Sequence, residues 1–89
     1  WNAKNLTLVN CTIESLQGMC YIDNLVMKNC KLINTTLAFE YSTVDAEIVS
    51  NITSVMNPSG GTITADHIGE LILEKDKVDP SKTKIIVKN

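Results

Sequence analysis

Three carboxylates are the residues of this sequence that most readily suggest chemistry. Asp23, Glu40 and Asp45 fall in neighbouring stretches of the chain, which a stack of short coils would place on adjacent levels. Polysaccharide-cleaving enzymes use stacked carboxylates as Ca²⁺ ligands or as an acid and a base. Those enzymes also line a long groove with Arg, Lys or aromatic side chains, whereas this chain has no Arg and only 4% aromatic residues. We therefore interpret the three carboxylates as solvated charges at coil corners.

Cysteine is the second residue type that could carry chemistry. Cys11, Cys20 and Cys30 are separated by 9 and 10 residues, whereas iron–sulfur sites need closely grouped thiolates. An odd number of cysteines without close pairs is also a poor disulfide framework. We therefore expect reduced thiols and a cytoplasmic setting. Cys11 and Cys30 fall at matching places of a repeat with side chains pointing the same way, so we expect a buried thiol stack rather than a strained bridge.

His67 is the single histidine, and it lies beside Asp66 and close to Glu70. This grouping could form a general base or a metal site. A lone His at the junction of a loop and a strand is more often simply solvated, and we favour that interpretation. The sequence therefore predicts no catalytic, cofactor-binding or metal-binding residue.

Length and composition exclude several classes of protein. The 89 residues make one small domain (residues 1–89), and a hydrophobic content of 44% is enough for a folded core. A net charge of −2 without Arg argues against nucleic acid, which needs clustered cations. No apolar run approaches the roughly 20 residues that span a bilayer. The chain opens on WNAKN without an initiator Met, which we interpret as the start of a C-terminal segment of a longer protein.

A repeat organises the chain. The stretch NLTLVNCTI (residues 5–13) returns 19 residues later as NLVMKNCKL (residues 24–32). Further copies can be placed at residues 44–55 and 68–78. The matching positions that we expect to point inward hold Leu6, Leu25 and Leu71 in one row and Leu8, Met27 and Leu73 in the next. Ile, Val and Thr supply 26 of the 89 residues, which favours strands within each copy.

Repeats of this length that consist of short strands indicate a solenoid. A leucine-rich repeat would need an upstream Leu and a helical back, and the segment IESLQGMCYI is too short and too rich in β-formers for that helix. We therefore predict an all-β fold, a short right-handed parallel β-helix of about four coils, stacked about 4.8 Å apart. Asn10 and Asn29 should lie at bends, because Asn tolerates left-handed backbone angles and can hydrogen-bond the Asn of the next coil.

The register of the third coil is open. A shift of 22 residues from the second coil would point Glu47 inward, which is costly. A shift of 21 residues points Ala46 and Ile48 inward and requires slippage before Ile52. We favour the second register.

The remaining segments carry turn signals. NPSGG (residues 57–61) predicts a loop. DPSKT (residues 79–83) predicts a turn, or one helical turn capped by Asp79, and KIIVKN (residues 84–89) predicts a final strand. Trp1, Cys20 and Phe39 follow one another at intervals of 19 residues, so we expect them in one inward stack.

These residues resemble a known family. WNAKNLTLVNCTIES, IDNLVMKNCKLINTTLAFEYSTVDAEIVS and DPSKTKIIV look like the C-terminal part of the bacterial domain of unknown function 3737 family, whose coils typically carry LxNCxI and WN elements. The resemblance implies a right-handed parallel β-helix of the pectate-lyase-like class, with more coils in full-length members. The biochemical role of the family is unassigned, and the resemblance carries over no site residue.

We expect the chain to be a structural β-helix segment, a C-terminal cap without catalytic activity or a cofactor. One alternative is part of a carbohydrate-binding or carbohydrate-modifying β-helix whose site lies mostly in coils outside this sequence. Another alternative is a protein-interaction surface built from the outward strand faces. The sequence does not name a ligand.

We expect the exposed N-terminal coil to be the site of association. It would meet either a second copy, in a two-fold dimer with the two first coils antiparallel, or further N-terminal coils of a longer parent protein. We expect the C-terminal end, after DPSKT, to be better covered.

Overall fold

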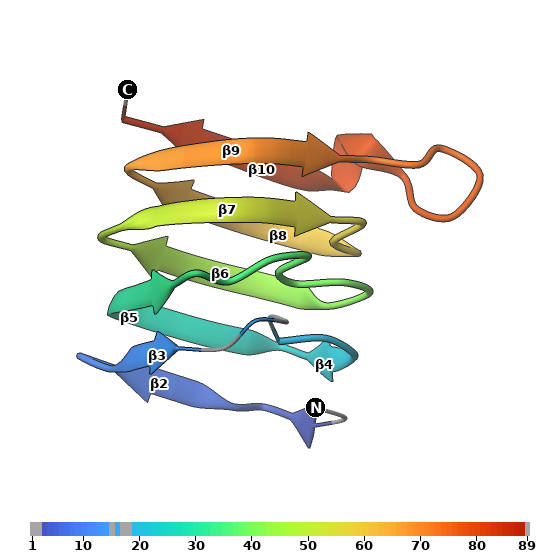
Figure 1. The fold of residues 1–89 in the computed structure, drawn as a ribbon. Coiled ribbons are helices and arrows are strands. Elements are labelled where there is room, and N and C mark those ends of the chain that lie inside the picture. Colours follow the sequence, from blue (N-terminus) through green and yellow to red (C-terminus); the bar gives the residue numbers. More distant parts are fainter. Residues whose placement is uncertain (1–2, 15, 17–18, 89) are drawn as a thin grey trace.

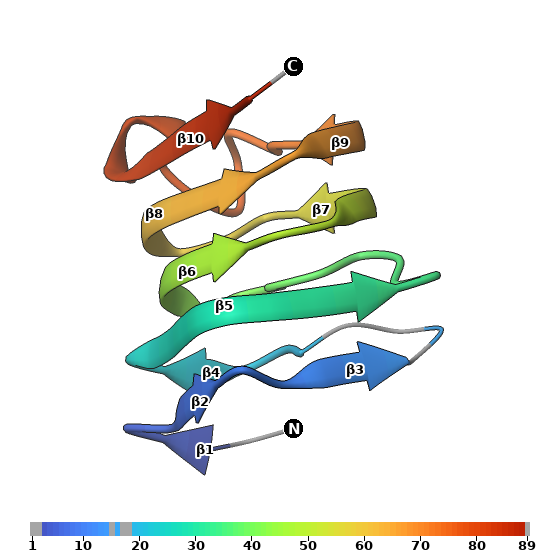
Figure 2. The same ribbon diagram turned by 90° about the vertical axis from the view of Figure 1, so that its left-hand side faces the viewer.

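The computed structural model describes residues 3–14, 16 and 19–88 (Figure 1). Its strands follow one another up a single stack from the N-terminus to the C-terminus (Figures 1 and 2). Coil 1 holds β1 (Ala3–Lys4), β2 (Thr7–Val9) and β3 (Thr12–Glu14), and coil 2 holds β4 (Ile22–Asp23) and β5 (Leu25–Ile33). Coil 3 holds β6 (Thr43–Ile48) and β7 (Asn51–Met56), and coil 4 holds β8 (Gly60–Ala65) and β9 (His67–Ile72). A 3-10 turn, η1 (Pro80–Lys82), and a last strand, β10 (Thr83–Val87), complete the fold.

The strands pair in parallel, each with the strand of the coil above or below it. The largest sheet has the order β10-β8-β6-β5-β2, while β3 also pairs with β5. Two smaller sheets pair β1 with β4 and β7 with β9. The predicted all-β parallel solenoid of about four coils is therefore confirmed. The part of the chain that the structure describes contains no helix long and apolar enough to cross a membrane.

The core is a column of inward side chains along the stack axis. Its central row follows the strand register in the order Leu8, Met27, Ala46, Ile63, Ile85. The three middle members of this row are buried and the two end members are partly exposed. Each inner coil thus has apolar neighbours above and below, whereas each end coil has them on one side only.

The predicted register of the fourth coil is wrong. The residues stacked above Leu25 are Val44 and then Gly61, not Leu71. Leu71 lies in β9 opposite Val55 and exposes 42% of its surface. The cause lies in the segment NPSGG, which was predicted to be a loop. Its last two residues, Gly60 and Gly61, already belong to β8, so the chain returns to the stack earlier than predicted.

Gly61 shows why this return was hard to foresee. Its φ of 105° is unfavourable for residues with a Cβ, and a Cβ at this position would overlap the carbonyl oxygen of Val44. The backbone of β8 therefore approaches β6 closely only because glycine stands there. A strand that starts with two glycines lacks the alternation of apolar and polar side chains at its first two positions, so its start cannot be recognised from the sequence.

The third coil adopts the inward residues that we favoured. Ala46 and Ile48 are buried, and the pairing passes from Met27↔Ala46 to Cys30↔Ile48, with one residue more on β5 than on β6. The extra residue is accommodated at Asn29, whose backbone N–H donates to Glu47 Oε1 at 3.1 Å. Glu47 therefore points outward and replaces a backbone carbonyl that the bulge removes.

Serine side chains complete the junction between coils 2 and 3. Measured along the inward row, coil 2 is 19 residues long (Met27 to Ala46) and coil 3 is 17 residues long (Ala46 to Ile63). Because coil 3 is shorter, some backbone N–H groups of coil 2 have no backbone carbonyl opposite them on coil 3. Three backbone N–H groups of coil 2 donate instead to serine hydroxyls of coil 3: Ile22 to Ser42 (3.0 Å), Leu32 to Ser50 (3.0 Å) and Leu37 to Ser54 (2.8 Å). These bonds keep the N–H groups satisfied where the coil length changes.

The asparagine bends are confirmed. Asn10 and Asn29 have φ values of 56° and 53°, and Asn29 Nδ2 donates to Asn10 Oδ1 at 2.8 Å. A second ladder joins Asn24 Nδ2 to Asn5 Oδ1 at 2.9 Å. These ladders explain why the first two coils repeat so closely in sequence.

The C-terminal segment follows the turn signals. Asp79 caps η1 and accepts the backbone N–H of Ser81 at 3.0 Å, and β10 covers residues of the predicted last strand. The predicted stack of Trp1, Cys20 and Phe39 is wrong in its register, because Cys20 bridges Glu40 and this places Phe39 beside Met19. Trp1 itself lies outside the described residues.

Candidate functional site

The three carboxylates singled out in the sequence do not converge. Asp23 lies on β4, Asp45 lies on β6 beside Val26, and Glu40 forms a bridge with Cys20. Among residues 3–14, 16 and 19–88, no group of three or more His, Cys, Asp or Glu side chains could hold a metal ion. The three acids thus belong to different segments of coils 2 and 3.

The cysteines serve packing within the coils. Cys30 is buried, and its thiol donates to the carbonyl oxygens of Leu8 and Lys28, both at 3.4 Å. Cys11 is half-buried and stacks on Cys30 in the register of β3 and β5. All three cysteines lie in the described part of the chain, and no disulfide joins them there. The predicted stacking of Cys11 on Cys30 is therefore confirmed, but the stack is buried only at Cys30.

His67 begins β9 and is exposed, and its register partner is Asn51. The neighbouring carboxylate of Asp66 pairs with Lys88 Nζ at 3.9 Å. Glu70 lies further along β9, opposite Ser54. These three residues therefore do not form one site.

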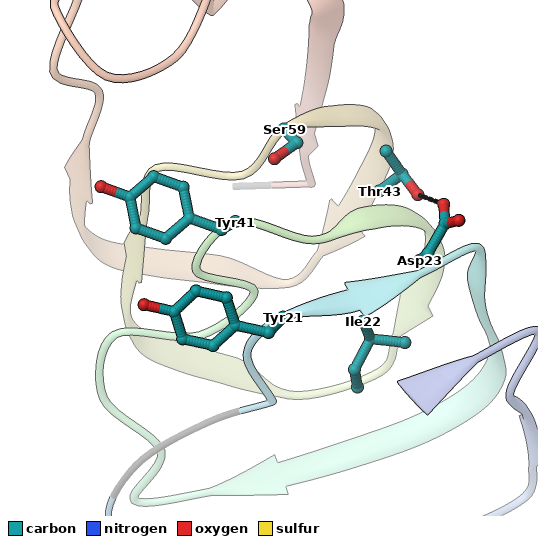
Figure 3. Close-up of a pocket in the computed structure, with 6 residues that line it drawn as sticks. All are labelled: Tyr21, Ile22, Asp23, Tyr41, Thr43 and Ser59. Atoms are coloured by element: carbon teal, nitrogen blue, oxygen red, sulfur yellow. Dashed lines mark hydrogen bonds between the residues drawn. The ribbon is translucent and has the colours of Figure 1, made fainter. Parts of the chain in front are cut away.

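A hollow on a different corner of the stack brings together aromatic, acidic and hydroxyl side chains. It has a volume of about 350 Å³. Its lining residues are Tyr21, Ile22, Asp23, Tyr41, Thr43 and Ser59 (Figure 3). In Figure 3 the two tyrosine rings lie together with their hydroxyls pointing the same way, and the pair of Asp23 and Thr43 lies away from the rings, at the other end of β4.

The two tyrosines occupy equivalent corners of coils 2 and 3. Tyr21 and Tyr41 have φ values of 56° and 50°, so both backbones turn through the left-handed region. The Tyr21 N–H donates to Glu40 O and the Tyr41 N–H to Asn57 O, both at 2.9 Å. The ring centroids are 5.6 Å apart with an interplanar angle of 28°. The coil ladder thus holds the rings in an offset stack at the surface.

A short hydrogen-bond chain orients the acid. The backbone N–H of Asn24 donates to Thr43 Oγ1 at 2.7 Å, and that hydroxyl donates to Asp23 Oδ1 at 3.2 Å. Asp23 pairs in register with Lys4 of β1. A second hollow of about 330 Å³, lined by Ala3, Lys4, Tyr21 and Asp23, adjoins the first because Tyr21 and Asp23 line both. The two hollows together form a groove that runs along the stack axis, and we call it the tyrosine groove.

A polar latch lies beyond the groove. Asn57 is fully buried with a φ of 45°, and its Nδ2 donates to Glu74 Oε1 at 2.8 Å, while the Glu74 N–H donates to Asn57 Oδ1 at 2.8 Å. Lys77 Nζ lies 3.4 Å from the same carboxylate oxygen. The hydrogen bond from Asn57, assisted by the charge of Lys77, lowers the pKa of Glu74. The latch thus fastens the segment after β9 to the corner of coil 3.

Sequence reasoning missed the tyrosine groove. The two tyrosines counted only as members of a small aromatic set, because the repeat search used a spacing of 19 residues. Tyr21 and Tyr41 are 20 residues apart, and this spacing matches the bridge between Cys20 and Glu40. A search that allowed coils of unequal length would have paired them.

The groove offers several kinds of contact to a ligand. Its lining residues supply aromatic faces, hydroxyls, one carboxylate and one ammonium group. Acid–base hydrolysis of a glycosidic bond uses two carboxyl groups at a defined separation. The groove lining contains one of them, Asp23.

Comparison with known proteins supplies a family. The family model described as "Protein of unknown function (DUF3737)" matches residues 1–86. No curated protein and no solved structure shows significant similarity to the chain. Because the match covers nearly the whole sequence, the chain belongs to the DUF3737 family of proteins of unknown function.

Proposed function

We propose that this chain is a non-catalytic structural segment of a β-solenoid that docks through its N-terminal coil. The observation that carries the proposal is the state of coil 1. Its inward residues pack against the core but remain partly exposed: Leu6, Leu8, Cys11 and Ile13. β2 is also the terminal strand of the largest sheet, paired with β5 on one edge. An apolar cross-section beside an unpaired strand edge is a template for a further strand.

The occupant of this edge in a solution of the chain is a second copy. A two-fold axis across the end of the stack brings coil 1 against coil 1 and pairs the two β2 strands antiparallel. Burial of the half-exposed column against its own copy is the simplest way to complete the core of a small domain. In a longer protein that contains this segment, preceding coils would occupy the same edge.

The C-terminal end also carries partly exposed apolar side chains, and its better cover relative to coil 1 stays a prediction. Leu71, Ile86 and Val87 expose 42%, 40% and 38% of their surfaces. A cluster of lysines distinguishes this end. Lys82, Lys84 and Lys88 lie in or beside β10 and are exposed. Lysines on an edge strand oppose pairing with a second copy, because like charges would meet across the axis.

The absence of catalysis in this proposal is supported by the dispersal of the acids over the stack. Asp23 is the one carboxylate of the tyrosine groove, and its partner groups are Thr43 and Lys4. We expect no hydrolase or lyase activity on pectin-like polymers. Turnover that Asp23→Asn abolishes would overturn this part of the proposal. The thiols of Cys11 and Cys30 support a reducing, cytosol-like compartment for the protein.

Light scattering after size exclusion tests the docking. We expect the unmodified chain to run as a dimer at high concentration and Thr7→Lys to run as a monomer, because Thr7 lies on the terminal strand. Thr62→Lys is the matched control, since Thr62 lies in the same outward row on β8, whose two edges are both paired. A monomer at all concentrations, or a dimer that only β10 variants disrupt, would refute the proposal.

A further inference from the structure

We infer that the tyrosine groove is a binding site for a neutral saccharide chain that lies along the stack axis, with Tyr21 and Tyr41 as its aromatic platform. The aromatic platform lies on coils 2 and 3, and only the second hollow of the groove reaches coil 1, at β1. The inference does not depend on the proposed structural role. Four observations carry the inference: the backbone at the two corners, the exposure of the rings, the orientation of Asp23 and the balance of charge in the groove.

The backbone shows that tyrosine is an unexpected choice at these corners. Bulky residues with φ near +50° are outliers, and Asn is the usual non-glycine choice. The chain follows that preference at its other bends, where Asn5, Asn10, Asn24, Asn29, Asn34 and Asn57 all have positive φ. Asn at positions 21 and 41 would hold the bend with less strain. The tyrosine rings therefore supply something that the bend itself does not require.

The Tyr41 ring is half-buried, but packing does not account for the exposed ring of Tyr21. Two other bulky residues, Leu37 and Phe39, have positive φ, but Phe39 is fully buried and Leu37 is half-buried, so the core holds their side chains. Tyr21 exposes 53% of its surface and contacts the ring of Tyr41 in an offset stack. An aromatic pair held rigidly at the surface is a ready contact for a ligand, because few degrees of freedom remain to be lost on binding.

The rings and the acid together match the two kinds of surface that a sugar presents. The negative face of an aromatic ring attracts the polarised C–H groups on the flat side of a pyranose. Carboxylate and hydroxyl groups elsewhere in the same hollow can bind the sugar hydroxyls. Thr43 already donates to Asp23 Oδ1, which fixes the carboxylate, and Asp23 is exposed, so its remaining lone pairs can accept hydroxyl donors.

The dimensions and the charge define the ligand further. The ring centroids are 5.6 Å apart along the stack, about the length of one sugar unit in an extended chain. The adjoining hollow of about 330 Å³ continues the groove toward β1 and extends the contact beyond a single sugar. Asp23 and Lys4 are register partners on neighbouring coils, and their charges sum to zero. A polyanionic sugar gains little here, in a protein of net charge −2, so a neutral oligosaccharide is the expected class.

Titration of the chain with defined hexasaccharides tests the site. The probes are cellohexaose, mannohexaose and chitohexaose as neutral chains and hexagalacturonate as the anionic chain. Binding is measured by calorimetry and by amide chemical shifts of ¹⁵N-labelled protein. We expect at least one neutral hexasaccharide to bind, with chemical-shift changes concentrated at the two tyrosine corners and at β4. We expect hexagalacturonate to bind at least tenfold more weakly than that neutral chain.

Tyr21→Asn is the decisive variant, because Asn suits the left-handed corner. We expect it to weaken binding at least tenfold while the melting temperature stays unchanged or rises. Tyr21→Phe keeps the ring and should bind within threefold of the unmodified chain. Ile33→Ala, another change of an exposed apolar side chain, lies on β5 away from the groove and should leave binding unchanged.

The outcomes separate this site from the docking edge. Failure of all three neutral chains to bind, preference for hexagalacturonate, or binding that survives Tyr21→Asn would overturn the saccharide site. A fall in stability of Tyr21→Asn without any measurable saccharide binding would show that the rings serve the fold alone, which also overturns it. Thr7→Lys should abolish the dimer and leave saccharide binding intact, so that each proposal can fail without the other.

Discussion

Replacing Leu25 with alanine perturbs the centre of the stack. Leu25 is fully buried, and the register places it directly between Leu6 and Val44. The change removes three carbon atoms, which at about 0.8 kcal/mol for each corresponds to about 2.4 kcal/mol of lost transfer free energy. The cavity adds a further penalty of about 24 cal/mol per Å³ of the space that does not collapse. We therefore expect the free energy of unfolding to fall by about 3–4 kcal/mol.

Leu71→Ala is the matched control for this prediction. The same three carbon atoms are removed, but Leu71 exposes 42% of its surface at the end of the stack and leaves no enclosed cavity. We expect a loss of about 1–1.5 kcal/mol, the share of the same transfer free energy that belongs to the buried part of Leu71. Urea unfolding followed by circular dichroism measures both values, provided that the slope of free energy against urea stays constant between variants. Both measurements should be made at low protein concentration, where association does not contribute to the free energy of unfolding.

Two results would refute the reasoning. A loss below about 0.5 kcal/mol for Leu25→Ala would mean that Leu25 does not lie in the core column. Equal losses for the two variants would mean that the fourth coil places Leu71 inward after all, as the repeat alone suggests.

Three further predictions concern the latch, the close approach of two strands and the last turn. The hydrogen bond from Asn57 lowers the folded-state pKa of Glu74, so the stability that this bond contributes is present above the ordinary glutamate pKa and is lost as the pH falls through the lowered pKa. Glu74→Gln should therefore be less stable than the unmodified chain at neutral pH. Melting curves measured at several pH values should show this difference disappear in strong acid. Gly61→Ala should cost more than about 2 kcal/mol in urea unfolding, since the new Cβ overlaps the Val44 carbonyl and φ is positive; a neutral effect would contradict the placement of β8. Asp79→Ala should cost about 0.5–1 kcal/mol through loss of the cap, and hydrogen exchange should show faster opening of η1 and little change in the coils.

The first two coils could be predicted in detail because their lengths are equal. Equal length puts Asn10 on Asn29 and Cys11 on Cys30, and Asn suits both ends of the hydrogen bond while tolerating the left-handed bend. Such ladders therefore appear in the sequence as identical residues at matching positions of the two coils. Alternation of buried and exposed residues in β6 also follows directly from the strand period, which is why Ala46 and Ile48 were assigned correctly.

The later coils could not be predicted in the same way, because they shorten. The junction between coils 2 and 3 is held by hydroxyls of Ser42, Ser50 and Ser54, and a serine that replaces a backbone acceptor has no distinctive sequence pattern. β8 begins on Gly60 and Gly61, which read as loop residues by composition. The register errors at Leu71 arise from this early return of the chain.

The tyrosine groove was invisible for a related reason. Its two rings lie at corners, where the backbone conformation normally favours Gly or Asn. Because Tyr is not typical of bends, the sequence does not indicate that these two residues lie at corners. Only the register of coils 2 and 3 reveals that Tyr21 and Tyr41 occupy equivalent places and share a hollow with Asp23.

Amide hydrogen exchange measured at low and high protein concentration tests the central claim, docking through coil 1, most directly. We predict that amides of Thr7–Val9 in β2 exchange more slowly as the concentration rises, because a second copy pairs with that edge, while amides of Thr83–Val87 in β10 do not change. In Thr7→Lys the concentration dependence should vanish. Protection that develops in β10 instead, or no dependence on concentration in either strand, would contradict the account.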